Sequence, residues 1–186
     1  LYTRNAGYTR KELIEKLDVK DGGNLSQSLN ALIASDFVIK YLPFGKGEKE
    51  RYKLVDPFCM FYLHFVDGKK QVNPDFWKQN VTAQSVVSWR GFAYENVCFH
   101  HIDQIKRALG ISGVITTQSA WSKRGGDSDG TQIDMLISRN DNVVNMCEIK
   151  YYGDTFEVDK GYYRVLMHRQ EQLAKQVSPK ISIHNT

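Results

Sequence analysis

The chain has 186 residues, of which 41% are hydrophobic and 25% are charged, so it can form one medium domain or a small domain joined to a larger one. Its 25 Lys and Arg residues exceed its 21 Asp and Glu residues by only four, and this excess does not by itself indicate nucleic-acid binding. The longest apolar stretch, residues 58–63, is far shorter than the roughly 20 residues of a membrane span. We therefore expect no membrane segment, and no signal-peptide pattern opens the sequence.

The three cysteines are few and widely separated. Cys59, Cys98 and Cys147 form no C-x-x-C pair, which argues against a disulfide scaffold and against a zinc site. We expect reduced thiols and a cytoplasmic location. The sequence starts at Leu1 and stops in a segment, residues 181–186, that reads as an unfinished strand, so we also expect a C-terminally truncated fragment of a longer polypeptide. The oligomeric state is left open.

The first 55 residues predict a helix, a turn, a second helix and a hairpin. Thr9 and Glu12 have the spacing of a capping box, and apolar residues then recur at helical spacing up to Leu17. Residues 25–36 predict the second helix, and residues 37–42 and 51–55 predict two strands. This order indicates an N-terminal winged helix-turn-helix. With a connecting helix that opens at Asp56-Pro57, we assign it to residues 1–67.

The predicted recognition helix is poorly suited to DNA because it contains no lysine or arginine. The hairpin offers Lys46, Lys49 and Arg51 as candidate nucleic-acid contacts, against two glutamates. We therefore leave two roles open for the winged helix, DNA binding and packing between domains.

The second part, residues 68–186, predicts the element order αβββαβ. The helix covers residues 88–109, the three strands cover 113–121, 131–138 and 142–151, and a helix over 160–177 precedes a last strand from residue 180. The polar, glycine-rich loop 122–130 carries Lys123 and Arg124, which could reach a phosphate. The predicted class is α+β or α/β with a central mixed sheet.

Three charged residues lie on the second and third of these strands. Glu148 and Lys150 are two residues apart, so in a strand they share a face, and Asp134 can join them if its strand lies alongside. Burying these charges without partners would cost several kcal/mol. Mg²⁺ or Mn²⁺ held by the two carboxylates would offset that cost, with the lysine orienting water or stabilising charge on a phosphate. The alternative is a pair of surface strands with solvated charges.

Glu95 lies in the middle of the apolar face of the first predicted helix of this part, three residues before Cys98 and four before Phe99. We interpret it as a further metal ligand, direct or through water. The alternative is a solvated helix edge, because Lys106 projects close to the same line.

Other polar and aromatic residues have two interpretations. Gln170 lies near the inner face of the later helix, as an additional site residue or as a capped core glutamine. Four tyrosines could stack on bases or form the edge of the core. They are Tyr151, Tyr152, Tyr162 and Tyr163.

The combination of Glu95, Asp134 and Glu148-Ile149-Lys150 in an αβββαβ order resembles the PD-(D/E)XK nuclease superfamily. The resemblance covers residues 88–186 and implies a restriction-endonuclease-like fold. It further implies that the carboxylates bind one or two Mg²⁺ ions and that Lys150 assists attack of water on a phosphodiester.

The whole chain also resembles the C-terminal part of a family of archaeal-type ATPases, in which a P-loop ATPase domain precedes a winged helix and a nuclease-like domain. The matching segments are residues 7–14, 51–58, 91–96, 132–134 and 148–150. The sequence has no G-x-x-x-x-G-K-[ST] motif, so the resemblance assigns ATP to an N-terminal domain absent from this sequence.

The predicted function is Mg²⁺-dependent hydrolysis of a DNA phosphodiester by the C-terminal region of an ATPase, with DNA and the ATPase domain as partners. Two alternatives stay open. One is a nuclease fold without catalysis that couples the ATPase to a protein or nucleic acid. The other is a winged-helix DNA-binding regulator with an unrelated α/β domain.

Overall fold

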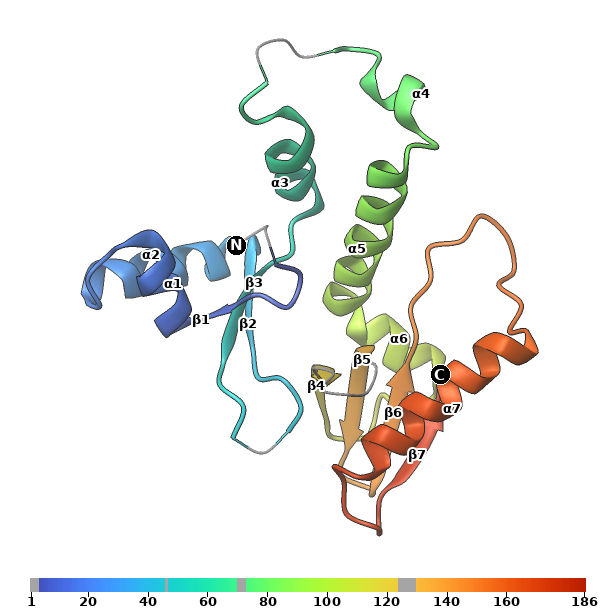
Figure 1. The fold of residues 1–186 in the computed structure, drawn as a ribbon. Helices are drawn as coiled ribbons and strands as arrows, with labels where there is room; N and C mark the ends of the chain where they lie inside the picture. The colour runs from blue at the N-terminus through green and yellow to red at the C-terminus, as the bar shows by residue number, and fades with distance from the viewer. Residues whose placement is uncertain (1–3, 46, 70–72, 124–129) are drawn as a thin grey trace. The chain divides into compact units, whose positions relative to one another are not determined.

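The structure is a computed structural model that describes residues 4–45, 47–69, 73–123 and 130–186. The chain divides into two compact units, one of residues 1–41 with 49–100 and the other of residues 42–48 with 101–186 (Figure 1). Both contain helices and a sheet, so the mixed α and β class is confirmed. The described residues form no helix with the length and hydropathy needed to cross a membrane.

The first unit begins with a small antiparallel sheet and two helices. Its elements are β1 (Tyr8–Thr9), α1 (Arg10–Leu17), α2 (Gly23–Ala34), β2 (Val38–Tyr41) and β3 (Arg51–Leu54). The strand order is β1-β3-β2. The predicted capping box is confirmed: the Thr9 side chain accepts a hydrogen bond from the Glu12 N–H, and the Glu12 side chain accepts one from the Thr9 N–H.

A cluster of apolar side chains holds these elements together. Its buried members are Tyr8, Leu13, Leu29, Val38 and Tyr52. Gly7 precedes β1 with a φ of +66°, and a Cβ atom there would lie 2.4 Å from the carbonyl oxygen of Tyr52. Glycine is therefore required where this segment crosses β3.

Four helical segments complete the first unit. They are α3 (Pro57–Phe61), the π-helix η1 (Tyr62–Val66), α4 (Phe76–Asn80) and α5 (Gln84–His100). Asp56 caps α3 and Pro57 occupies its first turn, as predicted. Aromatic rings from these segments pack mostly edge to face, among them Phe61 against Trp89, with ring centroids 5.4 Å apart.

The second unit contains a four-stranded mixed sheet. Its elements are α6 (Ile102–Ala108), β4 (Thr116–Lys123), β5 (Thr131–Arg139), β6 (Val143–Cys147), α7 (Lys160–Ala174) and β7 (Ser182–Asn185). The strand order is β4-β5-β6-β7, with β7 parallel to β6 and the other neighbours antiparallel. The predicted order of three strands, a helix and a strand is confirmed.

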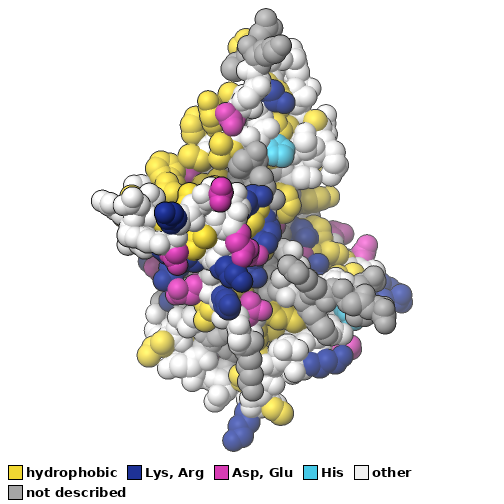
Figure 2. All heavy atoms as spheres, turned by 60° about the vertical axis from the view of Figure 1, so that its left-hand side comes forward, with side chains coloured by type: hydrophobic (Ala, Val, Ile, Leu, Met, Phe, Trp, Pro, Cys, Tyr) yellow, Lys and Arg dark blue, Asp and Glu magenta, His cyan; other side chains and the backbone are white. Residues whose placement is uncertain are grey.

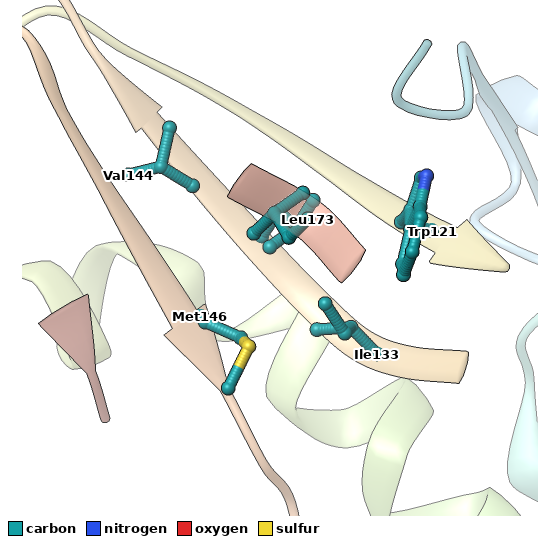
Figure 3. Close-up of a cluster of buried hydrophobic side chains, with 6 residues drawn as sticks. Trp121, Ile133, Val144, Met146 and Leu173 are labelled. Atoms are coloured by element: carbon teal, nitrogen blue, oxygen red, sulfur yellow. The ribbon is translucent and has the colours of Figure 1, made fainter. Parts of the chain in front are cut away.

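Helix α7 covers one face of this sheet through a cluster of apolar side chains (Figure 3). Leu173 of α7 is fully buried and lies over Ile133 and Val144, with Trp121 and Met146 on either side. Phe44, from the segment 42–48, packs against the same cluster, and its N–H donates to the Ala120 carbonyl at 3.0 Å.

Some predicted boundaries are wrong. The helix predicted over residues 88–109 is two helices, α5 and α6, separated at His101. The strand predicted over residues 142–151 ends at Cys147, so Glu148 and Lys150 follow the strand instead of lying within it. Residues 68–100 group with the first unit, and the domain boundary near residue 68 stays a prediction.

Candidate functional site

Asp134 and Glu148 are brought together by the pairing of β5 with β6. In this register Met135 is the partner of Cys147, so one step further Asp134 lies opposite Glu148. Residues directly opposite each other in an antiparallel pair carry their side chains on the same face. Alternation along β5 cannot be followed to Asp134, because the register with β4 shifts between Ser119 and Trp121, where two steps on β4 match three on β5. Glu148 faces α7, since its carboxylate contacts Tyr162 and Arg169 of that helix. The prediction that the Asp134 strand lies alongside is confirmed.

The backbone that follows β6 is held on both sides. The Ile149 N–H donates to Oδ2 of Asp134 at 3.0 Å. On the other side the Glu148 N–H donates to the Thr186 carbonyl at 3.0 Å, which extends the β6–β7 ladder by one residue. Glu148 thus has a fixed backbone position although it lies beyond the strand.

Three side chains contact the Glu148 carboxylate. Lys150 Nζ lies 2.6 Å from Oε1. The Tyr162 hydroxyl donates to the same oxygen, and the Arg169 guanidinium donates to Oε2. The side chain of Glu148 is largely buried, whereas that of Lys150 reaches solvent. The carboxylate is therefore compensated by two cations and a hydroxyl, as a buried charge requires.

Sequence reasoning missed Arg169, and it named Tyr162 only as a base-stacking or core-edge residue and not as a partner of Glu148. They are seven residues apart on α7, and Leu173 follows Arg169 by four residues, so all three share one face of the helix. Their spacing from Leu173, an apolar residue on the inner face of the helix, is the sequence signal that places Tyr162 and Arg169 on the side facing the sheet.

The two carboxylates differ in acidity. Burial raises the pKa of Asp134 above its ordinary value and the charge of Glu148 raises it further, against the opposing effects of the Ile149 N–H and the nearby cations. Burial acts in the same direction on Glu148. However, hydrogen bonds from Lys150, Tyr162 and Arg169 outweigh it and hold the pKa of Glu148 below its usual range.

Lys150 stays a cation in this environment. Burial lowers the pKa of its ammonium group and is the largest single effect, but the hydrogen bonds and charge interactions with Glu148 and Tyr162 together outweigh it, and the pKa lies above its ordinary value. A protonated lysine offers charge and hydrogen-bond donors and cannot act as a base. It is suited to binding an anion such as a phosphate.

The donor set fits a hard divalent cation. Mg²⁺ is usually bound through one or two carboxylates together with water and substrate phosphate. Asp134 and Glu148 supply two neighbouring carboxylates. Burial, and to a smaller extent the charge of Glu148, raises the pKa of Asp134, and a bound cation would favour its ionised form. Among the described residues no group of three or more His, Cys, Asp or Glu side chains is arranged to hold a metal.

Glu95 belongs to the first unit, on α5, whereas Asp134, Glu148 and Lys150 belong to the second. Its side chain is half-buried, and its Oε2 accepts a hydrogen bond from the Asn5 amide at 3.1 Å. The predicted apolar face of this helix is partly wrong: Phe92 is exposed, whereas Asn96 is fully buried. The assignment of Glu95 to the site stays a prediction.

Gln170 contacts β7. Its Oε1 accepts from the Asn185 amide at 3.1 Å and its Nε2 donates to the Ile183 carbonyl at 3.5 Å. These bonds favour the interpretation of a capped glutamine over that of a site residue.

The candidate nucleic-acid contacts are only partly described. Lys46 and Arg124 lie outside the described residues, and Lys123 is described as the end of β4 without its side chain. Lys49 is exposed, and Arg51 lies 4.0 Å from Glu12. On the face that Figure 2 shows, Lys and Arg side chains lie among Asp and Glu side chains, in keeping with the small net charge.

No protein-family model, curated protein or solved structure matches this chain.

Proposed function

We propose that this chain is the C-terminal region of an ATPase and carries a Mg²⁺-dependent phosphodiesterase with the PD-(D/E)XK nuclease fold, which cleaves DNA. The observation that carries the proposal is the meeting of Asp134 with Glu148 and Lys150 where β6 ends, two carboxylates beside a cation. The strand and helix order of the second unit supports it.

The side chains have distinct roles in this proposal. Asp134 and Glu148 would hold Mg²⁺ or Mn²⁺, and the metal would supply Lewis-acid stabilisation of the phosphate. Lys150 orients the attacking water and offsets the charge that develops on the phosphate oxygens. Arg169 and Tyr162 position Glu148, since they hold both of its carboxylate oxygens.

The first unit contributes a winged helix in this proposal. The helices α1 and α2 and the strands β2 and β3 support it by their order. Its α2 has no charged residue, so packing against the ATPase domain and weak DNA binding both fit it. ATP binding belongs to the ATPase domain outside this sequence.

The decisive experiment is cleavage of labelled DNA and RNA in Mg²⁺ or Mn²⁺. Asp134→Asn and Lys150→Met should each lower the rate roughly 100-fold or more, because the first removes a metal ligand and the second removes the positive charge that stabilises the phosphate. Asp154→Asn and Lys160→Met are matched controls that make the same changes at exposed positions. Asp154 lies between β6 and α7, and Lys160 is the first residue of α7. Equal rates for all five proteins would refute the assignment.

A second candidate is a binding module with the same fold and no catalysis. The observation in its favour is the internal compensation of Glu148 by Lys150 and Arg169, which satisfies the carboxylate without a metal. Calorimetry separates the two. Binding of Mg²⁺ or Mn²⁺ that is lost in Asp134→Asn supports the phosphodiesterase, whereas a folded protein that binds neither ion supports the binding module.

A further inference from the structure

The connection between β6 and α7 exposes aromatic side chains next to the candidate site. Tyr152 is 64% exposed and Phe156 is 38% exposed, although burial of such rings is favourable. All residues from 150 to 161 are exposed, so the rings are not part of the core. This exposure counts against a core-edge position for Tyr152, because a core-edge residue would be covered.

The rings form a continuous row, defined here as Tyr152, Phe156 and Tyr162. The centroids of Tyr152 and Phe156 are 5.7 Å apart at an interplanar angle of 84°, and those of Phe156 and Tyr162 are 5.2 Å apart at 76°. The row ends at the site, because the Tyr162 hydroxyl donates to Glu148 and Lys150 Nζ lies 5.4 Å from the centre of the Tyr162 ring.

The net charge of residues 150–164 bears on the kind of contact that a ligand of the row can make. Between residues 150 and 164 three basic residues are balanced by three acidic ones, so phosphate attraction is weak here. The basic residues are Lys150, Lys160 and Arg164, and the acidic ones are Asp154, Glu157 and Asp159. Affinity for a nucleic acid would therefore have to come from contacts with the rings and not from the net charge of this segment. Duplex DNA hides its bases and presents phosphates, whereas an unpaired strand offers its bases for stacking.

We propose that the row is a stacking platform for unpaired bases, so that the preferred substrate of the candidate site is a single strand or an unpaired segment. The inference about the substrate rests on the proposed function, and the platform itself can be tested without cleavage. A base stacked on Tyr152 or Phe156 directs its strand along the row toward Lys150 and the two carboxylates.

The test is fluorescence anisotropy of a labelled 12-nucleotide single strand, with the full chain carrying Asp134→Asn so that no cleavage occurs. Tyr152→Ala should weaken binding roughly tenfold, the usual effect of losing one stacked base. Tyr152→Phe keeps the ring and should bind as the parent does. Tyr163→Ala removes an equally large, 54% exposed tyrosine of α7 outside the row, and it should also leave the affinity unchanged.

Two further ligands distinguish binding through the bases from binding through the sugar-phosphate backbone. The same strand made abasic keeps the phosphates and should bind at least tenfold more weakly, and the matching duplex should also bind more weakly. Equal affinity for the abasic strand, or equal losses in Tyr152→Ala and Tyr163→Ala, would overturn the platform. So would unchanged affinity of Tyr152→Ala for every oligonucleotide, which would point to a protein segment as the ligand of these rings.

The outcomes distinguish this inference from the proposed function. Stacking on the row by a protein that never cleaves would contradict the phosphodiesterase and leave the platform standing. Cleavage with the same preference and the same KM in the parent and in Tyr152→Ala would contradict the platform and leave the phosphodiesterase standing.

Discussion

Leu173→Ala tests how α7 is attached to the sheet. Leu173 is fully buried among side chains of β4, β5 and β6, and it is the buried residue of α7. Replacing a buried leucine by alanine costs about 2 to 5 kcal/mol, depending on how far the surroundings collapse. Its neighbours sit on strands β5 and β6, which are each hydrogen-bonded on two sides, so little collapse is available. We expect a loss of about 3 to 4 kcal/mol in the free energy of unfolding of the second unit.

The measurement is native-state hydrogen exchange followed by mass spectrometry, which reports each unit separately. Peptides from β5, β6 and α7 should lose protection, and peptides from α1 and β3 should not change. Val165→Ala is the matched control on the same helix, because Val165 is 43% exposed and its truncation should cost less than about 1 kcal/mol. Equal losses for Leu173→Ala and Val165→Ala would refute the packing described for α7.

Three further predictions concern charge, capping and a close approach. The folded-state pKa of Asp134 lies above its ordinary 3.8, so its ionisation opposes folding as the pH rises through that pKa. Asp134→Asn should therefore raise Tm at pH 7 and 8, and the gain should shrink as the pH falls toward 4. A gain that is constant across these pH values would contradict this account. Thr9→Ala removes the N-cap of α1 and should cost about 1 kcal/mol in urea unfolding of the first unit. Gly7→Ala places a Cβ against the Tyr52 carbonyl at positive φ and should cost about 2 kcal/mol or more, whereas Gly23→Ala, with open space around it, should be nearly neutral in the same assay.

Local signals in the sequence predicted several features correctly. The capping box of Thr9 and Glu12 is a contact over three residues, so it depends little on the rest of the fold. The meeting of Asp134 with Glu148 was also predictable, because β5 and β6 are joined by a short connection and their apolar residues fix the register.

Other features depend on tertiary packing and could not be derived from the pattern. The end of β6 at Cys147 is one, because the hydrophobic run continues to Ile149. The partners of Glu148 are another, since Arg169 reaches it only after α7 has packed on the sheet. The full burial of Asn96 on α5 is a third, because hydropathy alone predicts that an asparagine is exposed to solvent.

The hydrogen bond from the Glu148 N–H to the Thr186 carbonyl makes the site sensitive to displacement of the last strand. The N–H of the next residue, Ile149, donates to the Asp134 side chain of β5, so a shift of this backbone would disturb contacts on both sides. A force or a binding partner that pulls on β7 would therefore be transmitted to the carboxylate through a single peptide group. The distance between Asp134 and Glu148 would then change without any contact to either side chain.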